Sequence, residues 1–270
     1  MLEVDKTWLT HLSKVIDKGL EVRVRGLESK ELMAHQSIVN MEDPIISIAQ
    51  RELGYKFMAQ EALNILTGQN TVHMIKDKSE RISQFSDDGY FFNGHYGPKF
   101  VDQITYIVDA LVEDMHTRQA VMSIWRPNPR PSKDIPCTIS LQFLVRANRI
   151  YCFLNMRSSD IWLGYPYDIF NMSCAAVFVS LLYGLRTGNK FRLGQLVFNT
   201  SNLHLYNTDL VKAQELCELK LPENDDLETK GVLDIDKWNH PLEFINWLWG
   251  KAKDGNFNDE VIIKPDGKNN

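Results

Sequence analysis

Apolar residues near the N-terminus recur at the spacing of one helix face, with Trp8, Leu12, Val15 and Ile16 in register. This pattern predicts a helix that ends near Gly19. Helical spacing also predicts four later helices, at 44–66 (closed by Thr67-Gly68), 101–112, 169–185 and 209–219. The segment 169–185 is apolar on nearly every side, so we expect a buried helix there.

Short apolar and β-branched runs predict six strands, at 21–25, 31–39, 120–125, 139–145, 150–156 and 195–205. Ala147-Asn148 is the predicted turn between two of them, and 76–97 and the proline-rich 126–136 are predicted loops. Because strands and helices interleave irregularly, the sequence predicts an α/β or α+β fold with one large mixed sheet flanked by helices.

With 270 residues, of which 44% are apolar, the chain can bury the core of one large domain. We expect this domain at 1–222, followed by a polar extension at 223–270. Four aromatic residues in the extension indicate that part of it docks on the domain: Trp238, Phe244, Trp247 and Trp249.

The net charge of -5 argues against general nucleic-acid binding, which needs clustered Lys and Arg, although local arginines can still bind small anions. The cysteines form no C-x-x-C pair and have no His-rich partner spacing; they are Cys137, Cys152, Cys174 and Cys217. We therefore expect no disulfide framework, no metal and a reducing compartment.

The N-terminus is amphipathic and charged, unlike a signal peptide. No apolar run reaches the ~18 residues that a membrane span needs. The expectation is a soluble, cytoplasmic protein without a membrane partner, in the host cytoplasm if a phage encodes it.

The candidate catalytic residues lie in two segments, 155–168 and Pro136-Cys137-Thr138. Cys137 opens one predicted strand and Arg157 closes its neighbour. An antiparallel pair brings these ends together, so a thiol, a guanidinium and the Asp168 carboxylate could share a site.

Each candidate also has an ordinary structural explanation. A lone cysteine at a strand start is usually a small buried hydrophobe, and Arg157 with Asp160 could be a strand-end ion pair. Asp168 could cap the following helix, since Asp is a favoured N-cap. His204 could be a satisfied core histidine and Arg118 a solvated charge. Glu61 is harder to dismiss, because an unpaired carboxylate on a largely apolar helix is costly.

Three features carry a family resemblance: the residues around Cys137, the Arg-Ser-x-Asp…Gly-x-x-x-Asp block, and His204-Leu205-Tyr206. Over roughly 25–219 the chain resembles the thymidylate synthase superfamily, and within it the phage-type deoxycytidylate hydroxymethylases. The resemblance implies a sheet-to-sheet homodimer, a pyrimidine nucleotide (dCMP) as substrate and 5,10-methylenetetrahydrofolate as co-substrate.

For catalysis, the resemblance implies Cys137 as nucleophile and Glu61 as the group that organises water, proton transfer and the folate side. Tyr96 matches a tyrosine near the reacting base. Asp168 stands where thymidylate synthases carry Asn, and Thr138 where they carry His. Cytosine reverses the donor and acceptor of uracil, and a carboxyl group fits the reversed pattern.

For binding, the resemblance implies a set of ligand contacts. Arg157, Ser158 and Arg25 (less favourably Arg23) match phosphate ligands, His204 and Tyr206 hold the sugar hydroxyl, Asp160 is a folate-side contact, and Arg118 reaches the partner subunit's phosphate. Two departures stand out. Gln119 replaces a second phosphate-directed arginine, and the chain ends in Lys268-Asn269-Asn270 rather than an apolar terminus.

The implied reaction is thiolate addition at C6, one-carbon transfer to C5 and water addition, giving 5-hydroxymethyl-dCMP. Arg157 is expected to lower the pKa of Cys137. The alternatives are a deoxycytidylate methylase, a ribocytidylate hydroxymethylase, an atypical thymidylate synthase, and a nucleotide- or RNA-binding regulator without turnover.

Overall fold

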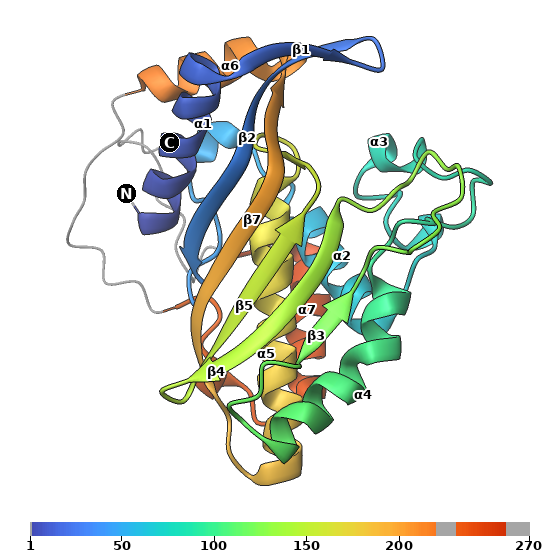
Figure 1. The fold of residues 1–270 in the computed structure, drawn as a ribbon, viewed down its shortest axis with the longest axis vertical. Helices are drawn as coiled ribbons and strands as arrows, with labels where there is room; N and C mark the ends of the chain where they lie inside the picture. The colour runs from blue at the N-terminus through green and yellow to red at the C-terminus, as the bar shows by residue number, and fades with distance from the viewer. Residues whose placement is uncertain (1, 220–230, 258–270) are drawn as a thin grey trace.

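The computed structural model describes residues 2–219 and 231–257 (Figure 1). Its strands join in one mixed sheet in the order β1-β2-β7-β5-β4-β3, with β6 paired to β7. The strands are β1 (Leu20–Val24), β2 (Leu27–Asn40), β3 (Val121–Ser123), β4 (Thr138–Arg146), β5 (Arg149–Met156), β6 (Ser159–Asp160) and β7 (Arg192–Tyr206). β7 runs parallel to β5 and β6 and antiparallel to β2, so the predicted mixed sheet is confirmed.

The β4–β5 hairpin forms as predicted. Ala147 and Asn148 have φ of 49° and 58°, the left-handed conformation that a two-residue turn of this kind requires. Buried residues alternate along both strands, and Phe143, Cys152 and Leu154 have no exposed surface. The hairpin therefore turns one face of the sheet to the core.

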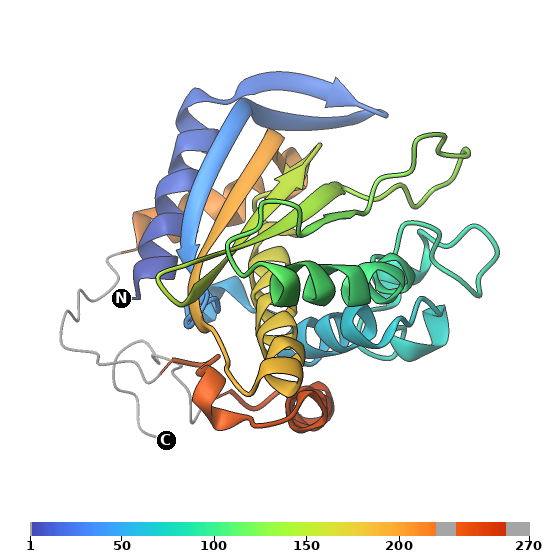
Figure 2. The same ribbon diagram turned by 60° about the horizontal axis from the view of Figure 1, so that its bottom comes forward.

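The helices are α1 (Glu3–Lys18), α2 (Tyr55–Thr67), α3 (Glu80–Ser83), α4 (Gly97–Glu113), α5 (Tyr165–Thr187), α6 (Asn207–Glu218) and α7 (Pro241–Asp254), with short 3-10 turns η1 (Ala49–Arg51), η2 (Val72–Met74) and η3 (Ile235–Lys237). Helices α2, α4, α5 and α7 lie on one side of the sheet, with α5 against it (Figure 2). α1 and α6 lie at the β1–β2 edge (Figure 1).

By length and composition, α5 could cross a membrane, contrary to the expectation that no segment is long enough. In the fold, 72% of its most apolar window is buried. It also begins at Tyr165, earlier than the predicted 169, because Gly164 and Pro166 start the helix before its apolar stretch. The structure thus gives α5 the place of a core helix.

The predicted helix at 44–66 is wrong in its first half. Ile45, Ile46 and Ile48 are buried, but in an irregular segment. Glu52 has a left-handed φ of 51° and Gly54 is the N-cap of α2, so the helix cannot extend back through them. The prediction failed because the apolar residues that are buried in this segment happen to have the spacing of a helix face. The predicted C-cap at Gly68 is present, with φ of 77°.

Several other boundaries differ from prediction; the strands predicted at 31–39 and 195–205, for example, begin earlier, at Leu27 and Arg192. α4 begins at Gly97 rather than 101, because Pro98 stands at a first-turn position where its missing N–H costs nothing. β3 is shorter than 120–125, and the predicted loop 76–97 contains the single-turn helix α3.

Part of the extension packs on the helical layer. α7 lies against α2, and the Trp238 and Phe244 ring centroids are 4.7 Å apart. Phe244 is fully buried, whereas Trp249 is 53% exposed. The boundary proposed at 222 falls outside the described residues, and the division of the chain there stays a prediction.

Candidate active site

Cys137 and Arg157 meet at the open end of the β4–β5 hairpin. The Arg157 guanidinium donates to the carbonyls of Pro136 and Ile135 at 3.0 Å each, and its Nη2 lies 3.7 Å from Cys137 Sγ. The Arg157 backbone N–H also donates to the Cys137 carbonyl at 2.9 Å. Arg157 thus fixes the backbone of residues 135–137, which lead into β4 and carry the Cys137 thiol.

Arg157 lowers the pKa of Cys137 as expected, but the net shift of this pKa is upward. Burial is the largest cause; Arg157 lowers the pKa, but Asp168 and Asp134 raise it. In the chain alone, desolvation of the thiolate therefore outweighs the nearby guanidinium.

Glu61 and Asp168 come from α2 and α5 and face the same region. Burial raises the pKa of Glu61 to about 7, while a 2.7 Å hydrogen bond from Asn171 Nδ2 lowers it. Burial also raises the pKa of Asp168 well above its ordinary value, and Glu61 raises it further. Two carboxyls in one desolvated region cannot both ionise cheaply.

Tyr96 ends the loop before α4 and lies among these groups. Burial raises the pKa of its hydroxyl well above the usual value, and Asp168 and Cys137 raise it further. Glu61 also raises the pKa of Tyr96, so Tyr96 interacts electrostatically with Asp168, Cys137 and Glu61. The four residues come from four separate segments of the chain.

Asp168 does not cap α5. The N-cap is Gly164, without a side-chain hydrogen bond, and Asp168 lies inside the first turn. The alternative reading of Asp168 as a helix cap is therefore wrong, and its carboxyl is available for other contacts.

Asn171 and Asn202 take part in the site, and sequence analysis did not select them. Asn171 lies three positions after Asp168, a spacing that places both on one helix face. Its Oδ1 is buried without a hydrogen-bond partner among the described residues. Asn202 lies two positions before His204 on the same face of β7, a spacing that the alternation of a strand predicts.

The His204 ring is held by two polar neighbours. Nδ1 lies 3.0 Å from Asn202 Oδ1 and 3.5 Å from Ser158 Oγ, and the ring packs edge-on to Tyr206 at 5.1 Å between centroids. Burial lowers the pKa of His204 to about 4, so the ring is neutral. With Asn202 as acceptor, Nδ1 carries the proton and Nε2 is left to accept.

Asp160 organises the turn that leads into α5. Its Oδ1 accepts from the backbone N–H groups of Trp162 and Leu163 at 2.9 Å each, and burial raises its pKa to about 6. Beneath this turn, buried Arg51 donates to the Trp162 carbonyl and stacks 4.6 Å from the Trp162 ring centroid. Arg51 is not among the site residues predicted from the sequence; it falls in the first half of the segment 44–66, where the predicted helix is wrong.

Arg25 occupies the tip of the β1–β2 hairpin, with φ of 51°. It is exposed, and its charge lowers the pKa values of Cys137 and His204. Arg23 instead donates to the Gly26 carbonyl within the hairpin. This difference favours Arg25 over Arg23 as the arginine that faces the site.

Arg118 lies apart from these residues, in the exposed segment before β3. Within the described chain its guanidinium makes no hydrogen bond or ion pair, whereas its carbonyl accepts from Gln142 Nε2 at 2.9 Å. The structure therefore leaves this guanidinium directed to solvent or to another molecule. Across 2–219 and 231–257, no cluster of three or more His, Cys, Asp or Glu is placed to hold a metal.

A thiol, a tyrosine and two carboxyls with raised pKa values in one region indicate an enzyme site rather than a structural charge cluster. The family model described as thymidylate synthase matches residues 6–240. The chain therefore belongs to the thymidylate synthase family.

One curated relative is a deoxyuridylate hydroxymethyltransferase from Bacillus phage SP01. It is 27% identical to this chain over 221 residues, which cover 73% of this chain and 56% of the relative. The chain thus spans little more than half the length of that relative.

Proposed function

We propose that this chain transfers a one-carbon unit from 5,10-methylenetetrahydrofolate to C5 of dCMP, and that water addition yields 5-hydroxymethyl-dCMP. Membership of the thymidylate synthase family supports the one-carbon transfer. The observation that carries the proposal is the convergence of Cys137, Tyr96, Glu61 and Asp168, whose charges act on one another.

Cys137 acts as the nucleophile. Cytosine C5 is a weak nucleophile, and a bond from Sγ to C6 turns C5 into an enamine carbon that can attack an electrophile. Burial disfavours the free thiolate, so the thiol ionises on substrate binding, with Arg157 Nη2 at 3.7 Å to stabilise the anion. This chemistry needs a reducing compartment, which is the basis for proposing a cytoplasmic location.

Asp168 reads the base. Its high pKa lets one proton be shared between the carboxyl and cytosine N3, while the other carboxyl oxygen accepts from the N4 amino group. When Sγ attacks C6, the shared proton neutralises the charge that develops at N3. An amide in the same place can donate a hydrogen bond but cannot release that proton.

Glu61 serves proton transfer at C5 and the activation of water. A pKa of about 7 lets this carboxyl both accept and release a proton near neutral pH. Asn171 positions it, and Asn171 Oδ1, which has no hydrogen-bond partner in the described part of the chain, offers an acceptor for a water or a ligand group.

The nucleotide is held by its two ends. Arg157, Ser158 and Arg25 bind the phosphate, because guanidinium groups match phosphate oxygens. His204 Nε2 and the Tyr206 hydroxyl hold the sugar hydroxyl. Placed this way, the phosphate and the sugar fix the base over Cys137 Sγ.

The described residues fit a folate co-substrate. Among the described residues the buried Asn171 Oδ1 has no hydrogen-bond partner, Nδ2 of the same side chain donates to Glu61, and the Asp160 carboxylate lies in the turn that leads into α5. The folate supplies the one-carbon unit at the oxidation level of formaldehyde. Glu61 and Asp160 would contact it, and Glu61 would direct water to the transferred carbon, so the other products are tetrahydrofolate and a regenerated thiol.

We further propose a homodimer formed through the open face of the sheet, the face of β4, β5 and β7 turned to the viewer in Figure 1. Along these strands the apolar residues opposite the core are only half-buried: Leu144, Tyr151, Phe153 and Val197. Pairing two such faces would remove this apolar area from water and carry Arg118 to the partner's phosphate site.

A second candidate is hydroxymethylation of dUMP. The curated relative from Bacillus phage SP01 is named for deoxyuridylate, and a protonated Asp168 could also donate to uracil O4 and accept from N3-H. The proposal that the substrate is dCMP rests on proton sharing between Asp168 and cytosine N3. Uracil already carries a proton at N3 and does not need this transfer.

The test is product analysis by mass spectrometry after incubation with methylenetetrahydrofolate and dCMP, dUMP or CMP. We expect 5-hydroxymethyl-dCMP as the main product. A methylated product would indicate hydride transfer instead of water addition, and a faster reaction with dUMP would overturn the choice of base. No product and no C5 proton exchange would favour a nucleotide-binding protein without turnover.

A further inference from the structure

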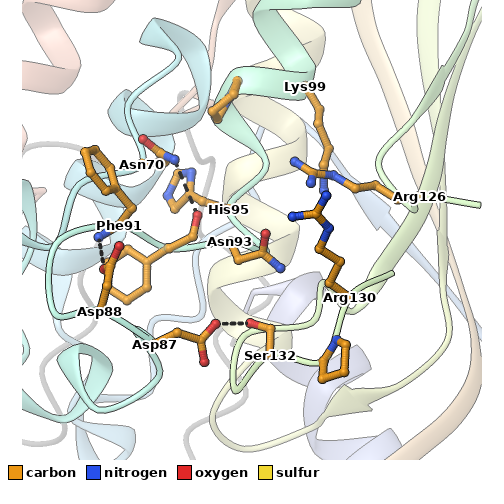
Figure 3. Close-up of a pocket in the computed structure, with 13 residues that line it drawn as sticks. Asn70, Asp87, Asp88, Phe91, Asn93, His95, Lys99, Arg126, Arg130 and Ser132 are labelled. Atoms are coloured by element: carbon orange, nitrogen blue, oxygen red, sulfur yellow. Dashed lines mark hydrogen bonds between the residues drawn. The ribbon is translucent and has the colours of Figure 1, made fainter. Parts of the chain in front are cut away.

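A cavity of about 400 Å³ lies outside the candidate active site (Figure 3). Its walls come from the loop that precedes α4, the first turns of α4 and the proline-rich loop after β3. It shares no residue with the set assigned to catalysis or nucleotide binding above. Its size falls in the range of small-molecule pockets.

One wall of this cavity carries three cations. The side chains of Lys99, Arg126 and Arg130 point toward one another in Figure 3. In the described part of the chain none of the three side chains makes a hydrogen bond or an ion pair, and Lys99 Nζ is buried without any partner. Burial lowers the pKa of Lys99 and the Arg126 charge lowers it further, while the Asp134 charge raises it.

The acidic residues of the cavity do not neutralise this wall. Asp87 accepts from Ser132 Oγ at 2.6 Å and from the Lys133 backbone N–H at 2.9 Å. Asp88 accepts from the backbone N–H groups of Tyr90 and Phe91. These carboxylates tie the two loops together. In the described part of the chain Arg126 and Arg130 make no ion pair, and the only acidic side chain whose charge acts on Lys99 is Asp134, which lies outside the cavity lining.

The opposite wall suits an uncharged ring. Phe91 is 53% exposed and lines the cavity beside the amides of Asn70 and Asn93 (Figure 3). An aromatic face with amide donors and acceptors can hold a heterocycle, while three cations bind an anion at the other end.

We propose that this cavity binds a small molecule that carries a phosphate chain joined to a flat heterocyclic ring. Lys99 Nζ is buried without a hydrogen-bond partner among the described residues, and the exposed Arg126 and Arg130 bring two further positive charges toward it, so all three would stabilise an anion in the cavity. Guanidinium groups match phosphate oxygens two at a time, and Lys99 adds a third positive charge on the same wall of the cavity. The proposal does not depend on the reaction that the chain catalyses.

The test is calorimetric titration of the full chain with tripolyphosphate and with dCTP, each with and without an excess of dCMP. We expect one tripolyphosphate bound per chain in the presence of dCMP, and tighter binding of dCTP. Displacement of either probe by dCMP would place it in the nucleotide site and overturn the proposal, as would the absence of binding.

Variants localise the binding. Lys99→Met and Arg130→Gln should each weaken tripolyphosphate binding by about tenfold or more, the usual cost of a lost charge-assisted hydrogen bond. Lys133→Gln, the matched control in the same loop but outside the cavity lining, should bind as the parent does. Equal weakening in all three variants would show general charge attraction and overturn the site.

Two further measurements test the occupant. Phe91→Leu should remove the advantage of dCTP over tripolyphosphate; a retained advantage would overturn the ring assignment. Penta-γ-glutamate, a carboxylate polyanion, should bind more weakly than tripolyphosphate, and the reverse order would overturn the phosphate assignment.

Discussion

Asn171 Nδ2 donates a hydrogen bond of 2.7 Å to Glu61 Oε2 and so links α5 to α2 inside the candidate active site. Asn171 is 1% exposed, and burial raises the pKa of Glu61 to about 7. Because the bond favours the ionised carboxylate, Asn171 holds this pKa lower than burial alone would set it.

Replacing Asn171 by Leu should raise the pKa of Glu61. A hydrogen bond to a charged group is worth roughly one to two pKa units, so the acidic limb of kcat/KM should move up in pH by about that amount. The measurement is the pH profile of turnover. Asn64→Leu is the matched control, since Asn64 is equally buried and bonds to Gln60 at 2.8 Å. Asn64→Leu should lower the stability of the protein and leave the acidic limb of kcat/KM where it is in the parent. If the acidic limb does not move in Asn171→Leu either, Glu61 is not the group whose titration sets it.

Cys137→Ala should abolish turnover and leave dCMP binding within about tenfold of the parent, because the phosphate ligands carry most ground-state affinity. Release of tritium from C5 of labelled dCMP measures the first steps directly. Cys152→Ala, at a fully buried core thiol, is the control that should keep turnover. Tritium release by Cys137→Ala would refute the covalent route.

Arg157→Gln should make the Cys137 thiol less acidic because, of the groups that lower the Cys137 pKa, Arg157 has the largest effect. A rise of about one unit would slow alkylation by iodoacetamide at neutral pH about tenfold. Arg157→Lys keeps the charge and should restore part of the rate. The same rate in parent and Arg157→Gln would mean that the guanidinium acts only on the Ile135 and Pro136 carbonyls.

Mixing Arg118→Ala chains with Cys137→Ala chains should restore part of the activity that each variant lacks. In a mixed dimer one site has both residues intact if Arg118 reaches the partner's phosphate. Turnover after subunit exchange is the readout, and Arg146→Ala, another exposed arginine, should need no complementation. Failure to complement in verified mixed dimers would place Arg118 in its own subunit's site or outside any site.

Asp168→Asn should lower kcat/KM for dCMP at least about a hundredfold and raise relative activity toward dUMP, because buried mismatched donors and acceptors are penalised heavily. The parent should lose dCMP activity at high pH: above the raised pKa the carboxyl has no proton to share with N3. The Asn variant, assayed with dUMP, should lack this limb. A variant that stays cytosine-specific would leave the choice of base without support.

Local pattern was enough to predict most elements of this protein. The β4–β5 hairpin, α1 and the Gly68 cap follow from alternation, helical spacing and turn residues, all of which act between close neighbours in sequence. The hairpin also places Arg157 beside Cys137, because antiparallel pairing joins the ends of two adjacent strands. Local pattern failed at 44–54, where tertiary packing buries apolar residues without a helix.

Tertiary structure alone decided how the groups act on one another. Glu61 meets Asn171 across 110 positions of sequence, and the direction of the Cys137 pKa shift depends on a balance of burial and charge that no spacing encodes. The cations Lys99, Arg126 and Arg130 come from a helix and a loop without periodicity, so only the folded chain brings them to one cavity. Sequence determines which groups are present and which local element carries them. Desolvation and long-range contact, which set their pKa values and partners, exist only once the chain has folded.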